Sequence, residues 1–241
     1  MNPPSHSLVE TEPEQPTGSH VVIPLESLVE RYARMAHTFE RRPVDRLLRG
    51  ADVVVAGTAL VVLSPVLLLC ALAVLETGRP VLYQGARVGR AGEIFTMYKF
   101  RTLRADAETR IGGYYGAELT ALTALEQTLV GKVLRFFHLD ELPQLFNVLR
   151  GDMSLVGPRP IRPTFFEELI LEIPAYWQRL VVRPGITGFA QLRLSREMTW
   201  AEKLAHDFEF VADRSLSLYL SVLAQTAWLV VKRAVTREPQ H

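Results

Sequence analysis

The chain has 241 residues, of which 48% are hydrophobic, with a formal net charge of +1 and a mean hydropathy of +0.11. This length is sufficient for one domain with a hydrophobic core, and the near-neutral charge gives no support for a nucleic-acid-binding protein. The single cysteine, Cys70, excludes an internal disulfide and is expected to pack inertly in the apolar run around it.

The N-terminal part of the sequence predicts a tail followed by a basic helix. The first 20 residues are rich in Pro, Ser, Glu and Thr, so we predict a disordered tail over residues 1–24. This tail has no basic stretch followed by an apolar one, which is why we do not expect a secretory signal. Residues 25–50 are compatible with a helix that becomes basic towards its end, at Arg41, Arg42, Arg46 and Arg49.

The hydrophobic residues concentrate in residues 53–75, a run of 23 residues without a charge that is long enough to span a bilayer as a helix. At its middle, Pro65 removes a backbone hydrogen bond and predicts a kink, where Ser64 can satisfy a freed carbonyl. Arginines flank the run on both sides, which favours the cytoplasm for both ends. A re-entrant helix over residues 51–77 fits these features, and a kinked transmembrane helix fits them about equally well.

The segment that follows the apolar run predicts a β-hairpin. Residues 81–84 and 94–103 read as two strands, joined by a turn at Arg90–Glu93. In the second strand Lys99 and Arg101 are expected on one face, because side chains alternate along a strand.

The second half of the sequence predicts mostly helices. Helical patterns cover residues 163–180 and 200–213, whereas RPGITG at 183–188 is typical of a turn-rich loop. Residues 215–233 form a second apolar stretch, which fits either a helix in the membrane interface or a core helix. The sequence therefore predicts an α+β fold: a mostly helical cytosolic domain with a small β-hairpin, anchored by a kinked re-entrant helix and interfacial amphipathic helices.

Two adjacent carboxylates, Asp140 and Glu141, precede a short apolar stretch. Because Pro143 is tolerated in a first helical turn, we expect a helix to begin at or next to Asp140 and to end near Gly151. One interpretation is that Asp140 caps this helix and Glu141 balances its dipole. The other is that one carboxylate attacks phosphorus while its neighbour holds a divalent cation such as Mg²⁺. Taken alone, the pair is better explained as a helix cap.

Four basic side chains are candidates for binding phosphate: Lys99, Arg101, Arg135 and Arg159. Each by itself is compatible with a solvated surface charge, but pyrophosphate chemistry needs such cations to neutralise the leaving phosphate. Arg159 lies between two prolines in a Gly-Pro-Arg-Pro run, whose restricted backbone is unusual for a casual surface arginine. The sequence contains no Walker loop, GxGxxG motif or zinc-ligand spacing.

Three segments, in this order, closely resemble the bacterial sugar transferase family. They are KFRTLRADAE at 99–108, LDELPQLFNVLRGDMSLVGPRP at 139–160 and RPGITGFAQL at 183–192. The family consists of small, monotopic polyprenyl-phosphate phosphoglycosyl transferases that start glycan assembly on a lipid carrier. The apolar run with its central Ser64-Pro65 also resembles the family's re-entrant membrane helix, so the resemblance extends from about residue 44 to residue 233.

The resemblance implies a reaction and roles for the candidate residues. A sugar 1-phosphate would pass from a UDP-sugar to polyprenyl (undecaprenyl) phosphate, releasing UMP, through a covalent phosphosugar intermediate on Asp140. Glu141 would bind Mg²⁺. By motif match the substrate-binding residues would be Lys99, Arg101, Arg135, Arg159 and Asp207, the last in an acidic position near the family's active site.

The resemblance also implies where the protein works. The catalytic domain, residues 78–241, would lie at the cytosolic face of the bacterial inner membrane, in contact with lipid, and a homo-oligomer is one of the states it allows. The sequence departs from the family at Glu126, where arginine is common, and at His138, where serine or threonine is frequent. The first departure leaves the nucleotide or sugar contacts there undetermined.

Two other classes of protein fit parts of the sequence. A catalytically inactive membrane scaffold of a glycan-assembly complex would explain the apolar run, but a scaffold has no need of an acid pair beside arginines. A kinase- or phosphatase-like enzyme that uses Mg²⁺ would need a phosphate-binding loop, which the sequence lacks. We therefore favour the transferase. The sequence does not indicate which sugar is transferred, or whether the product is an exopolysaccharide, a capsule, an O-antigen or a glycoprotein.

Overall fold

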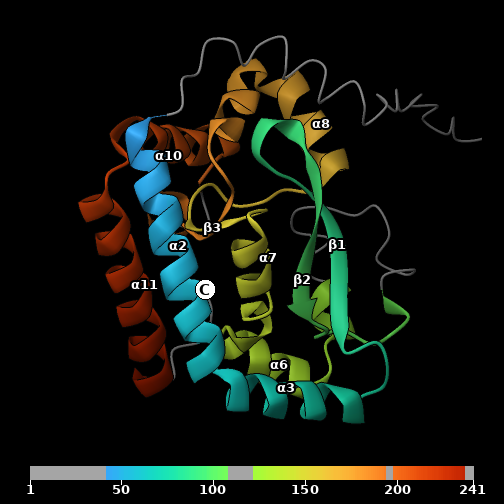
Figure 1. The fold of residues 1–241 in the computed structure, drawn as a ribbon. Helices are drawn as coiled ribbons and strands as arrows, with labels where there is room; N and C mark the ends of the chain where they lie inside the picture. The colour runs from blue at the N-terminus through green and yellow to red at the C-terminus, as the bar shows by residue number, and fades with distance from the viewer. Residues whose placement is uncertain (1–41, 108–121, 194–197, 237–241) are drawn as a thin grey trace, which may run out of the picture.

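A computed structural model describes residues 42–107, 122–193 and 198–236 of the chain (Figure 1). These residues form a mostly helical domain with a small antiparallel hairpin, which agrees with the predicted α+β class. The predicted tail, residues 1–24, and the first part of the predicted basic helix lie outside the described residues.

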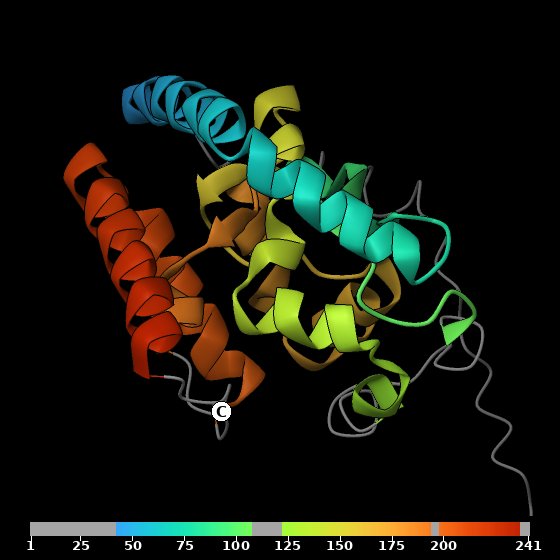
Figure 2. The same ribbon diagram turned by 90° about the horizontal axis from the view of Figure 1, so that it is seen from below.

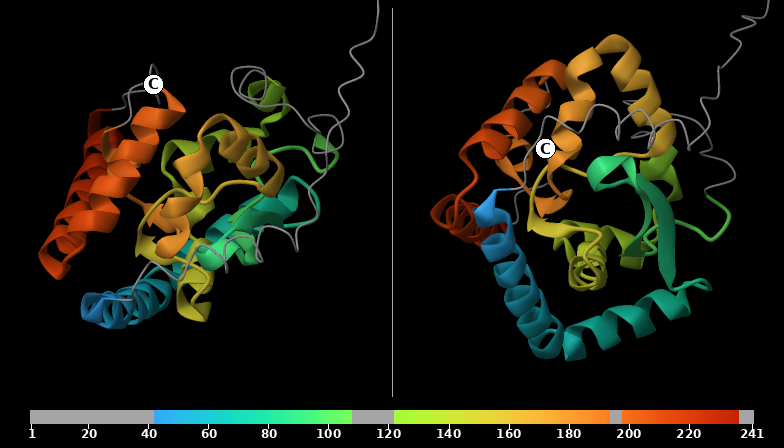
Figure 3. Two further views of the ribbon diagram at one scale, coloured as in Figure 1. Left: turned by 90° about the horizontal axis from the view of Figure 1, so that it is seen from above. Right: turned by 45° about the horizontal axis from the view of Figure 1, so that its top comes forward.

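The apolar run forms two helices that meet at a sharp bend. Helix α2 (Pro43–Val62) and helix α3 (Ser64–Glu76) are inclined by 64° to each other, and Figure 3 shows the angle between them. Ser64 Oγ donates a hydrogen bond to the Val61 carbonyl at 2.8 Å, so the predicted kink and the predicted role of Ser64 are confirmed. Among the described helices, only this bent pair taken together has the length and composition of a membrane segment.

The predicted hairpin is confirmed. Strand β1 (Leu82–Val88) pairs antiparallel with strand β2 (Ile94–Phe100), and the turn between them contains the short helix η2 (Arg90–Gly92). Tyr83 pairs with Lys99 in this register. Because side chains alternate along a strand, Tyr83 and Arg87 lie on the same face of the hairpin as Lys99.

A second, parallel pair of strands was not predicted. Strand β3 (Ser154–Val156) pairs with strand β4 (Gly185–Thr187), which lies inside the run expected to be a turn-rich loop. Three-residue strands are too short to show alternation, so the pattern carried no signal for them. Glycine is required where they meet, since a Cβ on Gly157 or on Gly185 would collide with the facing backbone.

The remaining helices agree with the predicted ones in place but not always in extent. Their bounds are α6 (Leu129–Phe136), η3 (Leu139–Glu141), α7 (Gln144–Arg150), α8 (Pro163–Glu172), η4 (Pro174–Val181), α9 (Phe189–Arg193), α10 (Trp200–Asp213) and α11 (Leu216–Thr236). The single helix predicted over residues 163–180 is interrupted, because Pro174 cannot continue an α-helix. Helix α10 has the predicted bounds and begins at a capping box formed by Thr199 and Glu202.

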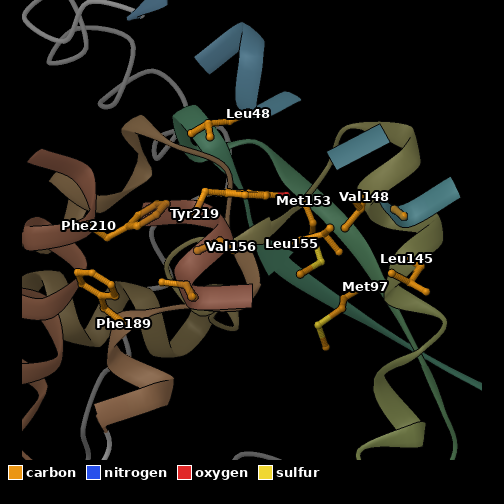
Figure 4. Close-up of a cluster of buried hydrophobic side chains, with 12 residues drawn as sticks. Leu48, Met97, Leu145, Val148, Met153, Leu155, Val156, Phe189, Phe210 and Tyr219 are labelled. Atoms are coloured by element: carbon orange, nitrogen blue, oxygen red, sulfur yellow. The ribbon is translucent and has the colours of Figure 1, made fainter. Parts of the chain in front are cut away.

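The central hydrophobic core lies between α2, α7, β3 and the C-terminal helices. Figure 4 shows its side chains, which include Val148 of α7, Leu155 of β3 and Tyr219 of α11. Phe189 and Phe210 add an edge-to-face ring contact with centroids 6.1 Å apart. Helices α2 and α11 run side by side against this core (Figure 1).

Helix α11 combines the two alternatives that its sequence left open. Tyr219 and Val222 are fully buried in the core, whereas Trp228 is 66% exposed and Val231 is 56% exposed. One side of the helix is therefore a core face, and the other presents large apolar side chains outward.

Asp52, the last charged residue before the apolar run, connects α2 to this core by hydrogen bonds. Its buried Oδ1 accepts hydrogen bonds from Ser154 Oγ (2.9 Å), from the Leu155 amide (2.8 Å) and from the Tyr219 hydroxyl (2.6 Å). One turn earlier, Arg49 donates to two carbonyls at the end of α7. Helix α2 is thereby attached to β3, α7 and α11 at once.

Replacing Asp52 with Ala should destabilise the fold strongly. The change removes the acceptor of three buried donors, and unsatisfied buried donors each cost about 1–3 kcal/mol, so we expect a loss of roughly 3 kcal/mol or more in the free energy of unfolding. Denaturant unfolding of the purified protein measures this loss. Tyr219→Phe, which removes a single hydrogen bond, should cost only about 1 kcal/mol; equal losses in the two variants would contradict the shared-acceptor arrangement.

Candidate active site

The two carboxylates lie in η3, the single turn between α6 and α7. Asp140 is only 8% exposed, and α7 begins at Gln144 with Pro143 in the cap position. A 3-10 turn does begin next to Asp140, at Leu139, and α7 ends next to Gly151 as expected, but α7 itself begins only at Gln144, so the interpretation of Asp140 as its cap is wrong. The turn instead places both acids beside strand β2 of the hairpin.

Glu141 is held by two cations from different parts of the chain. Lys99 Nζ of β2 lies 2.5 Å from Glu141 Oε1, and Arg159 Nη2 lies 3.9 Å from the same oxygen. Burial by itself would raise the pKa of Glu141, but the positive charges of Lys99 and Arg159 outweigh it and lower the pKa to about 2. Glu141 is consequently an ionised carboxylate at any physiological pH.

Asp140 has a different environment from its neighbour. Among the described residues, no side chain or backbone group forms a hydrogen bond with its carboxylate. Burial raises the pKa of Asp140, with Lys99 and Arg135 opposing this effect and the adjacent Glu141 adding to it. The result is a carboxylate that is more basic than in water and has both oxygens available for chemistry.

Arg135, at the end of α6, completes the immediate surroundings of the acid pair. Burial lowers its pKa, and the charges of Asp140 and Glu141 oppose that shift, so the guanidinium lies within electrostatic range of both acids. Its Nε donates to Thr102 Oγ1 at 2.9 Å, which orients the side chain. The structure thus brings together five of the predicted site residues: Lys99, Arg135, Asp140, Glu141 and Arg159.

Arg101 does not lie with them. It follows the end of β2, is buried, and donates hydrogen bonds to three backbone carbonyls, those of Gly78, Pro80 and Leu103, and to the Thr77 hydroxyl. These contacts tie the end of α3 to the hairpin. The structure therefore corrects the expectation that Arg101 faces a phosphate. Alternation would have placed Arg101 on the same face as Lys99 only if β2 had continued beyond Phe100.

Asp207 is connected to the acid pair indirectly, through Arg179 and Arg159. It is buried in α10 and forms an ion pair with the equally buried Arg179 at 2.8 Å, although burial still raises the pKa of Asp207. Arg179 Nη2 also donates to the Arg159 carbonyl at 2.9 Å. Asp207 therefore does not point at Glu141 but supports, through Arg179, the loop that carries Arg159.

Arg179 and Asp52 are the two residues that the sequence interpretation missed. Arg179 lies in η4, inside the segment predicted to be helical, where an arginine is ordinarily expected to be exposed. Asp52 did carry a signal, since a lone carboxylate at the edge of an apolar run must be either exposed or fully hydrogen-bonded.

An apolar cavity of about 510 Å³ opens beside the acid pair. It is lined by the bent helices, by the ends of the two hairpin strands nearest α3, and by Pro143 and Phe146 next to Glu141; of its lining residues only Ser64 is polar. Figure 2 shows α3 and α6 next to each other at this end of the domain. The cavity therefore extends from the bent pair to Pro143 at the start of α7, two residues after Glu141.

No cluster of three metal-ligating side chains exists among the described residues. Asp140 and Glu141 offer two hard carboxylates, and one or two carboxylates are what Mg²⁺ commonly takes from a protein when substrate phosphates and water supply its other ligands. The donor set thus fits Mg²⁺ only in the presence of a phosphate substrate.

Asp140, which has no hydrogen-bond partner among the described residues, and the ionised Glu141 lie near lysine and arginine side chains, an arrangement compatible with phosphate chemistry. The chain belongs to the bacterial sugar transferase family, whose model matches residues 44–233.

Several similar proteins are named for an activity or a pathway. The chain is 40% identical over 73% of its length to the UDP-N-acetylgalactosamine-undecaprenyl-phosphate N-acetylgalactosaminephosphotransferase of Aeromonas hydrophila, of which it covers 41%. It is 38% identical over 77% of its length to the UDP-glucose:undecaprenyl-phosphate glucose-1-phosphate transferase of Caulobacter vibrioides, of which it covers 70%. It is 36% identical to the exopolysaccharide production protein ExoY of Rhizobium meliloti, over 77% of its own length and 86% of the relative.

The ion pairs of Glu141 should make stability sensitive to acid. Its pKa is lowered from 4.5 to about 2, so the stabilisation is fully present above pH 4.5 and is lost as the pH falls through the folded-state pKa near 2. We expect the Glu141→Gln variant to lack this loss, which is on the order of 2–3 kcal/mol. Denaturant unfolding at pH 6 and at pH 2.5 tests it, with the exposed Glu168→Gln as control. The same acid dependence in Glu141→Gln and wild type would show that Glu141 is not the group that titrates.

Proposed function

We propose that this protein transfers a sugar 1-phosphate from a UDP-sugar to undecaprenyl phosphate, as the first membrane step of glycan assembly. The observation that carries the proposal is the contrast between the two adjacent acids: Glu141 is neutralised by Lys99 and Arg159, whereas Asp140 is buried without a hydrogen-bond partner in the described part of the chain. The names of two relatives, which include a UDP-sugar and undecaprenyl phosphate, support this choice of substrates.

The first step forms a bond between an Asp140 oxygen and the phosphorus that carries the sugar. The bond from this phosphorus to the bridging oxygen of the diphosphate breaks, and its electron pair leaves with UMP. Charge therefore develops on the leaving phosphate. Arg159, with 56% of its side chain exposed and its guanidinium next to Glu141, is placed to receive that charge.

The second step transfers the phosphosugar to the lipid. A phosphate oxygen of undecaprenyl phosphate bonds to the same phosphorus, and the bond to Asp140 breaks with its electron pair returning to the carboxylate. The enzyme is thus regenerated without net proton transfer. The apolar cavity beside Pro143 and Phe146 fits the first isoprene units of such a lipid, since its lining is apolar and it opens at the bent helices.

Mg²⁺ is the cation we propose for this site, with Glu141 as its protein ligand. When bound together with the substrate it would supply charge neutralisation to the diphosphate. The two carboxylates then have separate tasks: the ionised Glu141 would bind the cation, and the more basic Asp140 would form the covalent bond.

For the bent pair we propose a re-entrant arrangement, in which α2 and α3 enter and leave the membrane by its cytosolic face. The 64° bend and the exposed apolar side chains of both helices support it, among them Val61, Val62, Leu68 and Leu69. The attachment of α2 to three elements of the domain through Asp52 and Arg49 keeps the catalytic site at the membrane surface.

Asp140→Asn should abolish turnover while the protein remains folded, since an amide does not form the acyl phosphate. With a panel of UDP-sugars and undecaprenyl phosphate we expect UMP release to fall by about a thousandfold or more. The exposed Asp213→Asn serves as the matched control and should retain activity. UMP release near the wild-type rate in Asp140→Asn would rule out Asp140 as the nucleophile.

The re-entrant arrangement predicts that both ends of the bent pair are cytoplasmic. Reporter tags placed before residue 43 and at the C-terminus should both be inaccessible to a periplasmic labelling reagent in intact cells, because the chain does not cross the bilayer. A C-terminal tag labelled from the periplasm would mean that α2 and α3 form a kinked transmembrane helix instead.

A further inference from the structure

Two arginines at the far end of the hairpin have no place in the steps above. Arg87 is the last residue but one of β1, and Arg162 immediately precedes α8. Val88 and Ile161 form an antiparallel bridge, with the Val88 amide donating to the Ile161 carbonyl at 2.9 Å. An antiparallel bridge at this pair sets Arg87 opposite Arg162.

The side chains of the bridge determine which way the arginines face. Val88 and Ile161 are both buried in one hydrophobic cluster. Because side chains alternate, Arg87 faces the opposite way, on the hairpin face that also carries Lys99. Lys99 of β2 pairs with Tyr83 of β1, and Arg87 lies four residues further along β1, roughly 13 Å away. The Arg159 guanidinium that contacts Glu141 belongs to the loop leading to Ile161.

The positive charges of Arg162 and Arg159 act on the pKa of Arg87. Burial lowers the pKa of Arg87, and the positive charges of Arg162 and Arg159 lower it further. Among the described residues, no carboxylate forms an ion pair with Arg87 or Arg162. Arg162 and Arg159 therefore both repel the Arg87 guanidinium, a repulsion that an anion would relieve.

The local structure holds Arg87 in this position. Its Nη1 donates to the Ala86 carbonyl at 2.7 Å, and its charge interacts with Tyr83. The Tyr83 ring reaches it by lying along the strand across Gly85, where a Cβ would collide with the ring. A guanidinium has more N–H groups than this hydrogen bond uses, so donors remain for a ligand.

We propose that Arg87 and Arg162, together with Arg159, bind the phosphate of the nucleotide that leaves in the reaction. The inference rests on the proposed function. The nucleotide is favoured over the lipid phosphate because the apolar cavity adjoins the other end of the hairpin, at Val81, Leu82 and Phe100. Glu141 is contacted by Lys99 near the cavity end of the hairpin and by Arg159 from the loop that leads to the other end, so the nucleotide and the lipid would approach the acid pair from different directions.

Direct binding of UMP to the full chain in lipid nanodiscs tests the proposal without requiring turnover. Titration calorimetry should show UMP affinity lowered by about tenfold or more in Arg87→Gln and in Arg162→Gln, since each loses a charge-assisted hydrogen bond to phosphate. Farnesyl phosphate, a short polyprenyl phosphate, should bind all variants as it binds wild type. Arg150→Gln is the matched control, because Arg150 contacts Tyr98, whose side chain is on the opposite face of the same hairpin.

The outcomes separate the possibilities. UMP affinity within about twofold of wild type in both variants would overturn the proposal, and so would weakened binding of farnesyl phosphate with UMP unaffected, which would assign the site to the lipid. If Arg87→Gln does not fold, Arg162→Gln still decides the question. Wild-type protein that binds UMP through these arginines but releases none from any UDP-sugar would refute the proposed function and leave this binding site standing.

Discussion

The position of the apolar helix pair depends on one buried carboxylate. Asp52 accepts three hydrogen bonds through a single oxygen. Two come from the adjacent residues Ser154 and Leu155 of β3, and the third comes from Tyr219 of α11, far away in the sequence. A carboxylate in a core is unfavourable unless it is fully satisfied, so this arrangement allows only one way of seating α2 against β3 and α11. Pro65 bends the chain between α2 and α3. The attachment of α2 through Asp52 therefore also determines how the apolar surface of α3 is oriented relative to the core.

The hairpin connects that apolar surface to the chemistry. At one end its strands line the apolar cavity and Lys99 contacts Glu141, and at the other end Arg87 lies opposite Arg162. A short twisted hairpin is marginal alone, and here α7 braces it: Asn147, which is fully buried, accepts from the Tyr98 amide and donates to the Thr96 carbonyl. The hairpin that carries Lys99 is therefore supported by α7 along β2.

Sequence interpretation succeeded where a feature is local. The hairpin, the kink at Ser64-Pro65 and helix α10 follow from turn residues, proline and capping residues that act within a few positions. It failed where the decisive partner is distant. The pairing of β3 with β4, the tethering role of Arg101 and the ion pair between Asp207 and Arg179 all depend on groups from other elements.

The sequence by itself determined which residues are chemically capable: an acid pair, a set of cations and a Pro-interrupted apolar run, in an order that identified the family. It left the task of Asp140 undecided, because capping a helix and attacking phosphorus both need an acid before a short apolar stretch. Only the tertiary structure argues against the cap, and it supports the attack on phosphorus that we propose. It starts α7 at Gln144 and brings Lys99 and Arg159 to Glu141 from strand and loop, while Asp140 stays buried without a hydrogen-bond partner among the described residues. The pKa values of two neighbouring carboxylates separate only through such contacts, and sequence adjacency carries no information about them.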